Sequence, residues 1–397
     1  MKKGWQTKTL GETCDVVNGG TPKTGVPEYW DGQHRWITPA EMGKRLSPYV
    51  SETERMISDL GLRNSSAQML PPHSVILSSR APIGHLVINT ELMATNQGCK
   101  GLMPRSQLQY KFLYYYLSSI VDLLNSLGTG ATFKELSGGK LKEVEIPVPP
   151  LAEQQRIVGL LDEAFEGLAT AKANAEQNLQ NARALFESHL QSVFTQRGPG
   201  WVQKRLGDVV TRLTNGFVGP TRNIYHESGV PYLLARHVKN NRLLFDGKTF
   251  ISDEFNRKNK KSLLKAGDVL LVQSGHIGHS AVVTEDHEGH NCHAMIVITA
   301  VKDAFLGPFL SLFFNSSGMK QKFQEIRSGS TVPHLTCGEV KELMIPMPDL
   351  ATQRRVVGHS QELDEATQRL ARLYERKIAA LEALKKSLLH QAFTGEL

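Results

Sequence analysis

The chain carries one segment twice. Residues 146–158 (Ile-Pro-Val-Pro-Pro-Leu-Ala-Glu-Gln-Gln-Arg-Ile-Val) return 199 positions later as residues 345–357 (Ile-Pro-Met-Pro-Asp-Leu-Ala-Thr-Gln-Arg-Arg-Val-Val). The same offset of 199 relates residues 190–195 to residues 389–394. The chain is therefore two copies of one module, each a variable body followed by a constant tail. Two copies at a fixed spacing predict contact with two places on one long partner.

Weaker matches extend the repeat into the two bodies. Residues 4–5 (Gly-Trp) match residues 200–201 at an offset of 196, and residues 83–85 (Ile-Gly-His) match residues 277–279 at an offset of 194. An offset that changes indicates small insertions, which loops tolerate and packed elements do not. We therefore expect the bodies to differ in detail and the tails to match.

Composition bounds the class of protein. A chain of 397 residues exceeds one ordinary hydrophobic core, and 40% hydrophobic with 21% charged residues predicts globular domains. The net charge of +7 is compatible with an anionic partner. Neither a signal peptide nor an apolar run long enough to span a bilayer is present, and the four cysteines form no C-x-x-C pair. We expect a cytoplasmic protein with no membrane contact.

Each body is predicted to be mixed α and β. Short β-rich runs lie between glycines and prolines at residues 36–38, 74–79, 86–88, 232–234, 268–273 and 281–284. Each body also contains one stretch typical of a helix, at about residues 108–124 in the first and about 308–326 in the second.

The tails are predicted to be long helices. Apolar residues recur at four-then-three spacing, which is a coiled-coil heptad pattern, with occasional polar interruptions such as Lys172, Thr367 and Lys377. The seam is formed by Leu161, Phe165, Leu168, Ala175, Leu179, Ala182, Phe186 and Val193 in the first tail, and by Leu363, Leu370, Tyr374, Leu381, Leu384 and Leu388 in the second. Proline-rich segments precede both helices, and we expect them to act as stiff joints.

An apolar seam on an isolated helix would face water, so we expect the tails to pack on each other. Because the copies are joined tail to head, an antiparallel pair places one body at each end. A helix of roughly 40 residues spans about 60 Å, which suits one to two turns of duplex DNA at about 34–36 Å each. The predicted fold class is α+β: two mixed α/β domains, residues 1–150 and 198–349, separated by two long antiparallel coiled-coil helices, residues 151–197 and 350–397, as an internal pseudo-two-fold repeat.

These motifs resemble the specificity subunit of Type I restriction–modification enzymes. The resemblance covers the whole chain, and its most specific elements are the two blocks at 146–158 and 345–357 and the ending at 388–397 (Leu-Leu-His-Gln-Ala-Phe-Thr-Gly-Glu-Leu). The turns at residues 128–132 and 329–331 are also similar to those of the family.

The resemblance implies two target-recognition domains, each reading one half of a split, asymmetric double-stranded DNA target. The two helices would fix the gap and dock two copies of the adenine methyltransferase (modification) subunit, and restriction/translocase subunits would complete a host-defence complex. The block residues expected to bind these partners are Gln154, Arg156, Gln353 and Arg355. The blocks differ where Thr352 replaces Glu153 and Asp349 replaces Pro150, so the two joints are expected to differ slightly in angle.

Catalytic motifs are missing from the sequence. The Asn/Asp-Pro-Pro-aromatic tetrad of a DNA methyltransferase is absent. Residues 128–130 (Gly-Thr-Gly) lack the third glycine of a dinucleotide fingerprint, and residues 138–141 (Gly-Gly-Lys-Leu) do not complete a phosphate loop. We expect a non-catalytic subunit without a cofactor of its own. By resemblance, S-adenosylmethionine, ATP and Mg belong to partner subunits.

Candidate DNA-binding residues flank glycine turns, where a backbone can approach a duplex. Arginine pairs with guanine, and asparagine or glutamine pairs with adenine. The candidates are Asn18, Thr21, Lys23, Arg80, Asn96 and Gln97 in the first body, and Asn215, Thr221, Arg222, Gln273, Ser274, His276 and His279 in the second. The alternative is that these are solvated loop residues, with Asn18-Gly19 and Asn215-Gly216 forming turns of positive φ.

Histidines gather in the second body. The cluster consists of His276, His279, His287, His290, Cys292 and His293. Imidazole and thiolate are the usual ligands of zinc, and the alternative is a histidine-rich hairpin near DNA. Pro82 stands at the position of His276 in the first copy, and only His85 recurs. A metal needed by the fold should recur in both copies, so no metal is expected.

A rival function is a duplicated coiled-coil adaptor that joins proteins without binding DNA. DNA binding through phosphates must weaken steeply with salt, whereas an adaptor would not respond to DNA. An electrophoretic mobility shift at two salt concentrations separates the two.

Overall fold

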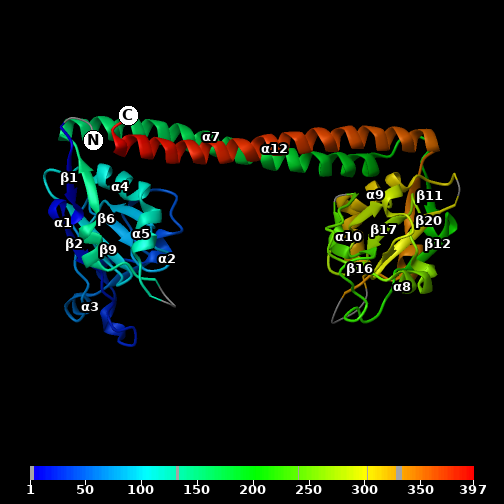
Figure 1. The fold of residues 1–397 in the computed structure, drawn as a ribbon, viewed down its shortest axis with the longest axis horizontal. Coiled ribbons are helices and arrows are strands. Elements are labelled where there is room, and N and C mark those ends of the chain that lie inside the picture. The colour runs from blue at the N-terminus through cyan, green and yellow to red at the C-terminus, as the bar shows by residue number, and fades with distance from the viewer. Residues whose placement is uncertain (1–3, 131–133, 240, 302, 328–332) are drawn as a thin grey trace. The chain divides into compact units, whose positions relative to one another are not determined.

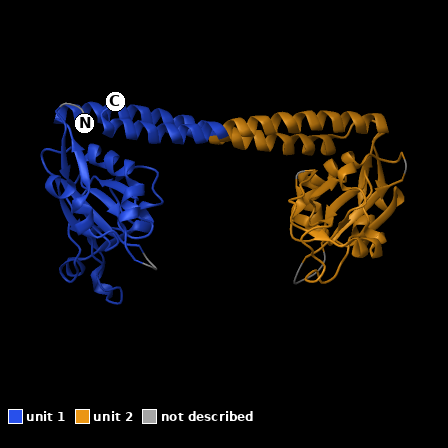
Figure 2. Ribbon diagram, in the orientation of Figure 1, with its two compact units in different colours: residues 1–175, 376–397 blue, residues 176–375 orange. Residues whose placement is uncertain are grey.

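The computed structural model describes residues 4–130, 134–239, 241–301, 303–327 and 333–397. The chain forms two compact units (Figure 2). Unit 1 comprises residues 1–175 and 376–397, and unit 2 comprises residues 176–375. Each unit therefore contains one body together with parts of both tails.

The first body, in unit 1, is built on a five-stranded sheet covered by helices α4 and α5 (Figure 1). Its strands, in sheet order, are β2 (Cys14–Asn18), β9 (Cys99–Pro104), β6 (Val75–Ser78), β7 (Leu86–Asn89) and β4 (Tyr49–Val50). Only the β7–β4 pair is parallel. Strand β6 lies at the centre and is buried along its length, which explains why it reads as a continuous apolar run.

A second, three-stranded sheet completes the first body. Strand β3 (Trp30–Ile37) lies between antiparallel β5 (Arg55–Ile57) and parallel β8 (Met93–Thr95). Short helices α1 (Leu10–Thr13), α2 (Pro39–Met42) and α3 (Asp59–Arg63) connect the strands, and each begins at a Ser or Thr whose side chain accepts a backbone N–H.

The second body, in unit 2, repeats this plan. Its four-stranded sheet has the order β12 (Val210–Asn215), β20 (Met295–Ala300), β17 (Val269–Val272) and β18 (Ser280–Val282). Its three-stranded sheet has β13 (Val230–Leu233) between antiparallel β16 (Phe250–Ile251) and parallel β19 (Asn291–Cys292). A hairpin of β14 (Val238–Lys239) and β15 (Arg242–Leu243) and helix α8 (Asp253–Lys258) lie between these strands in the chain. All six strands expected from the sequence are present.

The proline-rich segments are strands rather than bare joints. In unit 1, β10 (Glu145–Val148) pairs antiparallel with β1 (Gln6–Thr9), and in unit 2, β21 (Met344–Met347) pairs antiparallel with β11 (Val202–Arg205). Each is preceded by a short helix, α6 (Gly138–Glu143) or α11 (Cys337–Lys341). The segment entering each long helix is therefore held by a ladder as well as by its prolines.

Where the sequence predicts a single helix in each body, the structure has two consecutive helices. In unit 1 these are α4 (Tyr110–Ser119) and α5 (Val121–Leu127), and in unit 2 they are α9 (Gly307–Asn315) and α10 (Ser317–Ile326). At Ser316 the backbone is extended, with ψ 148°, and the Ser316 hydroxyl donates to the Phe313 carbonyl at 2.6 Å. The Ser316 N–H also donates to the Phe313 carbonyl, at 3.1 Å, so the last turn of α9 is closed by local bonds to Ser316.

The tails are the helices α7 (Leu151–Gln196) and α12 (Leu350–Thr394). They run antiparallel in each unit, because residue numbers rise along α7 as those of its partners fall along α12. In unit 1, Lys172 pairs with Glu382 at 2.8 Å and Arg156 bonds to Leu397 at 2.8 Å. In unit 2, Arg183 pairs with Glu375 at 2.7 Å and His189 lies 3.2 Å from Ser360. Most of the expected seam is buried or half-buried, and Ala175 is 1% exposed. The expectation was wrong for two members, because Leu370 and Leu384 are 38% and 47% exposed and face away from the packed stripe. Across the described ranges no helix combines the length and the apolar character needed to cross a membrane.

Candidate nucleic-acid interface

Three strands of the first body place their loops at one end of the five-stranded sheet. Strand β2 ends at Asn18, opposite Lys100 near the start of β9. Strand β6 ends at Ser78, opposite Cys99. The segments that carry the candidates Asn18, Thr21, Lys23, Arg80, Asn96 and Gln97 therefore all leave the sheet at this end.

Two of these candidates contact each other. The Asn96 Nδ2 donates to the Thr21 Oγ1 at 3.0 Å, and the Asn96 Oδ1 accepts the Gly98 N–H at 2.8 Å. The side chains of Asn18, Lys23 and Gln97 are exposed. The Asn96 amide is thus oriented by the protein, and it fixes the Thr21 hydroxyl beside the exposed candidates.

Arg80 belongs to a charge cluster that sequence reasoning only partly found. Its Nε lies 3.0 Å from the Glu135 carboxylate, and the Lys100 Nζ lies 3.9 Å from the same carboxylate. Lys100 is 5% exposed, and burial lowers its pKa, with Glu135 acting in the opposite direction. The sequence signal that could have identified Lys100 as a site residue is a lysine inside an otherwise apolar strand. Glu135 holds two cations at the sheet end.

The second body presents the equivalent sheet end. Asn215, the last residue of β12, lies opposite Ile296, and Val272, the last residue of β17, lies opposite Met295. Gln273 and Ser274 follow β17 directly. This brings the segments carrying Asn215, Gln273, Ser274, His276 and His279 to one end of the four-stranded sheet.

The same backbone bond closes both sheet ends. The Leu136 N–H donates to the Ser79 carbonyl at 2.8 Å in unit 1, and the Leu335 N–H donates to the Gln273 carbonyl at 2.9 Å in unit 2. Arg80 then pairs with Glu135, and Ser274 pairs with His334, as isolated bridges. The two bodies therefore hold their candidate residues in the same local frame, although the side chains differ.

The remaining candidates of the second body differ in exposure. Gln273 is 8% exposed, and its Oε1 is buried without a hydrogen-bond partner among the residues that the structure describes. The Cys337 thiol donates to the Asn215 Oδ1 at 3.1 Å. Thr221 is half-buried and Arg222 exposed, on the segment between β12 and β13.

The histidines of the second body lie as two pairs of rings. His276 and His279 have ring centroids 5.7 Å apart at the β17–β18 turn, and His287 and His290 have centroids 5.8 Å apart. Burial raises the pKa of the Cys292 thiol to about 12. Within the described part of the chain, no three His, Cys, Asp or Glu side chains are grouped so that they could hold a metal ion.

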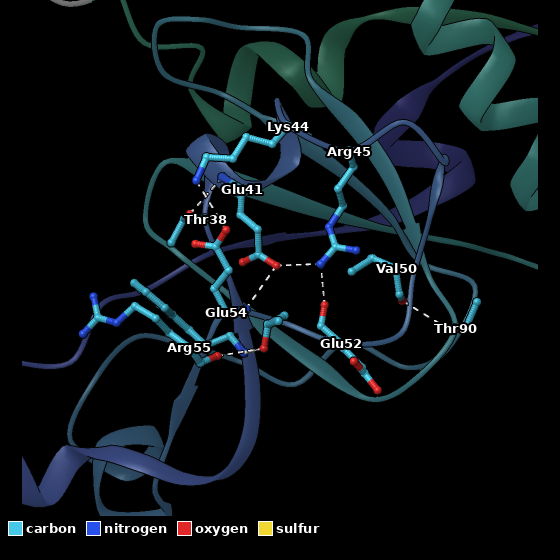
Figure 3. Close-up of polar contacts among 11 residues, drawn as sticks. Thr38, Glu41, Lys44, Arg45, Val50, Glu52, Glu54, Arg55 and Thr90 are labelled. Carbon is cyan, nitrogen blue, oxygen red and sulfur yellow. Dashed lines mark hydrogen bonds and ion pairs between the residues drawn. The ribbon is translucent and has the colours of Figure 1, made fainter.

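A buried carboxylate that the sequence did not suggest anchors a loop of the first body (Figure 3). Glu41 is 4% exposed, and its Oε1 accepts from the Arg45 Nη2 at 2.6 Å and from the Glu54 N–H at 3.2 Å. The position 196 residues later is His237, which is 1% exposed and lies 3.1 Å from Asp246. Each body therefore holds this loop through one buried titratable side chain that contacts a partly exposed partner, Arg45 in the first body and Asp246 in the second.

The block residues expected to bind partners fall into two kinds. Gln154 and Gln353 are fully buried. The Gln154 Nε2 donates to the Gln107 and Pro149 carbonyls, and its Oε1 accepts the Gln109 N–H. This burial leaves the glutamines no surface for direct contact with a partner, and we reassign them to holding the helix on its body.

Arg156 and Arg355, in contrast, have exposed side chains. The Arg156 guanidinium binds Glu153 at 2.7 and 2.9 Å, and it also donates to the Leu397 backbone oxygen at 2.8 Å. In the turns that resemble the family, Thr129 exchanges two backbone bonds with Glu135. The rest of these turns, residues 131–132 and 329–331, lies outside the described residues.

Comparison with known proteins gives a consistent picture. A family model for the Type I restriction modification DNA specificity domain matches residues 2–180 and 199–382. The Type I restriction enzyme MjaIX specificity subunit of Methanocaldococcus jannaschii is 27% identical, over 100% of this chain and 94% of its own length. The EcoR124I/EcoR124II specificity subunit of Escherichia coli is 33% identical over 39% of each chain.

Solved structures show the same fold. A chain from a structure on complex assembly and conformational transition of the type I R-M system has a TM-score of 0.79 at 19% identity, covering 100% of this chain and 99% of that one. The HsdS subunit from Thermoanaerobacter tengcongensis has a TM-score of 0.63 at 17% identity, covering 100% and 98%. These likenesses confirm the expected fold class. The family model and the full-length relative do not favour the adaptor without DNA binding.

Proposed function

Because this chain belongs to the family of Type I restriction–modification specificity subunits, we propose that it reads a split double-stranded DNA target through its two bodies. Residues 1–150 recognise one half of the target and residues 198–349 the other. The observation that carries this proposal is the likeness of the two sheet ends. The same backbone bonding holds the candidate segments in both bodies, but the polar side chains on those segments differ.

Readout of the first half-target uses the side chains around the ends of β2 and β6 and the start of β9. Lys23 supplies an exposed cation, and the Arg80 guanidinium is held by Glu135. The oriented Asn96 amide and the Thr21 hydroxyl supply hydrogen bonds to base edges. In the second body, the residues that contact DNA are Asn215, Thr221, Arg222, Gln273, Ser274, His276 and His279.

The helices α7 and α12 form two equivalent docking surfaces for two methyltransferase subunits. Leu185 on α7 is 50% exposed, and Leu384, its equivalent 199 positions later on α12, is 47% exposed. Exposed leucines at matching positions suit an apolar contact with two identical partners. Arg156 and Arg355 add a charged rim, and restriction/translocase subunits join through the methyltransferases.

The chain itself is non-catalytic. Adenine methylation with S-adenosylmethionine, and ATP- and Mg-dependent cleavage, belong to the partner subunits. The contribution of this chain is to hold the reading side chains in place, so that the partners act only where both halves match.

The test is an electrophoretic mobility shift with the complex of this chain and its methyltransferase subunits. Target sites are first found by mapping methylated adenines in a host that carries the system. The complex should bind a duplex with both halves tightly, and affinity should fall with log salt at a slope of about −0.9 per phosphate contacted. Equal affinity for scrambled duplexes at every salt concentration would refute sequence reading.

A further inference from the structure

The segment from Gly19 to Lys23 lies tightly against its neighbours in the first body. The Gly19 N–H donates to the Cys99 carbonyl at 3.0 Å, and the Gly20 N–H donates to the Thr95 carbonyl at 2.8 Å. A Cβ atom on Gly20 would lie 2.1 Å from the Ala67 nitrogen. At positions 19 and 20 a side chain would therefore collide with neighbouring backbone, and only glycine fits there.

Two tryptophans donate hydrogen bonds to the same segment. The Trp36 Nε1 donates to the Gly20 carbonyl at 2.9 Å, and the Trp30 Nε1 donates to the Lys23 carbonyl at 3.3 Å. The two rings meet edge to face, with centroids 5.2 Å apart, and both are buried. A buried indole N–H needs an acceptor. Here both acceptors are carbonyls of the segment that carries Thr21 and Lys23.

The tryptophans also hold an arginine. The Arg55 Cζ lies 3.8 Å from the centroid of Trp30 and 5.4 Å from that of Trp36. Arg55 is exposed and lies opposite Trp36 in the β3–β5 pair. Figure 3 shows its guanidinium directed away from the Glu41 network. A guanidinium stacked on an aromatic face is fixed in orientation, and its N–H edge can still bind an acceptor.

We propose that Trp30 and Trp36 are positioning residues for DNA reading by the first body, and that Arg55 is a DNA contact that they hold in place. The inference rests on the proposed function and adds three residues to it. The indole N–H groups fix the backbone under Thr21 and Lys23, and the indole faces fix the Arg55 guanidinium. The DNA acceptor is a phosphate oxygen or the O6/N7 edge of a guanine.

The described residues of the second body do not repeat this arrangement, which makes the proposal specific to one half of the target. Tyr232 stands where the first body has Trp36, 196 positions later, in the middle strand of the three-stranded sheet. Its hydroxyl lies 3.5 Å from the His293 Nδ1. Loss of the tryptophan N–H groups should therefore affect the first half-target alone.

The experiment uses the full chain in complex with its methyltransferase subunits. Affinity is measured for the mapped duplex and for duplexes altered in one half or the other, at two salt concentrations. Trp30→Phe and Trp36→Phe keep a ring and remove the N–H, and Arg55→Gln removes the guanidinium. Arg63→Gln, an exposed arginine of the same body, controls for charge. Phe112→Leu, in the helical core of the same body, controls for lost stability.

Arg55→Gln should lower affinity roughly 5- to 100-fold, and Arg63→Gln should leave it within about twofold. A smaller salt slope assigns Arg55 to a phosphate, and lost discrimination at one G·C pair assigns it to guanine. Trp30→Phe and Trp36→Phe should each reduce discrimination against altered bases in the first half-target about 2- to 10-fold. Discrimination in the second half-target should be unchanged. The loss should exceed that caused by Phe112→Leu when variants of equal stability are compared.

The inference is overturned if the wild-type complex reads both halves but the tryptophan variants match Phe112→Leu, or if Arg55→Gln matches Arg63→Gln. A wild-type complex that reads neither half would instead refute the proposed function.

Discussion

Gln154 and Gln353, 199 positions apart, make the same two hydrogen bonds at the start of their helices. Each Nε2 donates to a proline carbonyl five residues earlier, Pro149 or Pro348, at 2.9 Å. Each Oε1 accepts a backbone N–H that precedes a helix of the body, from Gln109 at 2.8 Å or Leu306 at 2.9 Å. The repeated glutamine therefore joins body to tail in both units.

Replacing either glutamine should destabilise the chain to a similar degree. Gln154→Leu removes the acceptor of the partly buried Gln109 N–H, and Gln353→Leu does the same to the Leu306 N–H. An unsatisfied buried backbone group costs about 1–3 kcal/mol. Urea unfolding of the two variants should show this loss, and Gln155→Leu, at an exposed neighbour, should not. If Gln154→Leu and Gln353→Leu were as stable as Gln155→Leu, the role of these glutamines in joining body to tail would be contradicted.

A histidine pair should make the unit 2 helices sensitive to acid. His189 and His359 have ring centroids 5.2 Å apart, and the positions 199 away are Leu388 and Leu160. Burial, and then His359, lower the pKa of His189. The folded state therefore binds fewer protons than the unfolded state, so stability is retained above about pH 6.5 and lost as the pH falls through the lower folded pKa.

His189→Leu should flatten this dependence. Thermal unfolding is compared at about pH 7.5 and about pH 5.5, with His390→Leu, exposed on α12, as the control. The other buried histidines are common to all variants, so the difference between curves isolates His189. A wild-type curve parallel to that of His189→Leu would rule out its contribution.

The helices should set the gap between the two half-targets. Inserting about four residues between Ala175 and Glu176 lengthens α7 by roughly 6 Å. A matching insertion between Glu375 and Arg376 is needed, because α7 and α12 pair antiparallel within each unit. At about 3.4 Å per base pair, the unspecified gap should grow by one or two base pairs with both half-sequences unchanged. An unchanged gap would show that something else sets the spacing.

Two docking surfaces predict two methyltransferase subunits per chain. Native mass measurement of the purified complex should give this ratio. Leu185→Ser and Leu384→Ser, each at one surface, should each weaken one of the two binding steps, because an exposed apolar anchor is lost. A saturated, active complex with a single methyltransferase would contradict the proposal.

The long-range repeat made much of the fold predictable. Apolar periodicity located the helices, and short β-branched runs located the central strands, because these patterns depend on neighbours in the chain. Leu370 and Leu384 were placed in the seam wrongly, since spacing alone cannot tell which side of a wide apolar stripe is covered.

The site was less predictable, because its contacts are non-local. Gln154 accepts a hydrogen bond from Gln109, 45 positions away, so the repetition of this glutamine in the sequence did not distinguish a structural residue from a docking one. Trp36 reaches Gly20 across 16 positions, and nothing in the local sequence marks that bond. Glycine turns did locate the loops that gather at each sheet end, because a close backbone approach requires glycine.

Exchange of one body tests the central claim, that two bodies read two half-targets independently. Residues 200–344 are replaced by the equivalent segment of a relative with a different target, and methylated adenines are mapped across a host genome. We predict a split target in which one half is that of the parent, the other half is that of the relative, and the gap is unchanged. A change in both halves, or a continuous target, would contradict the account.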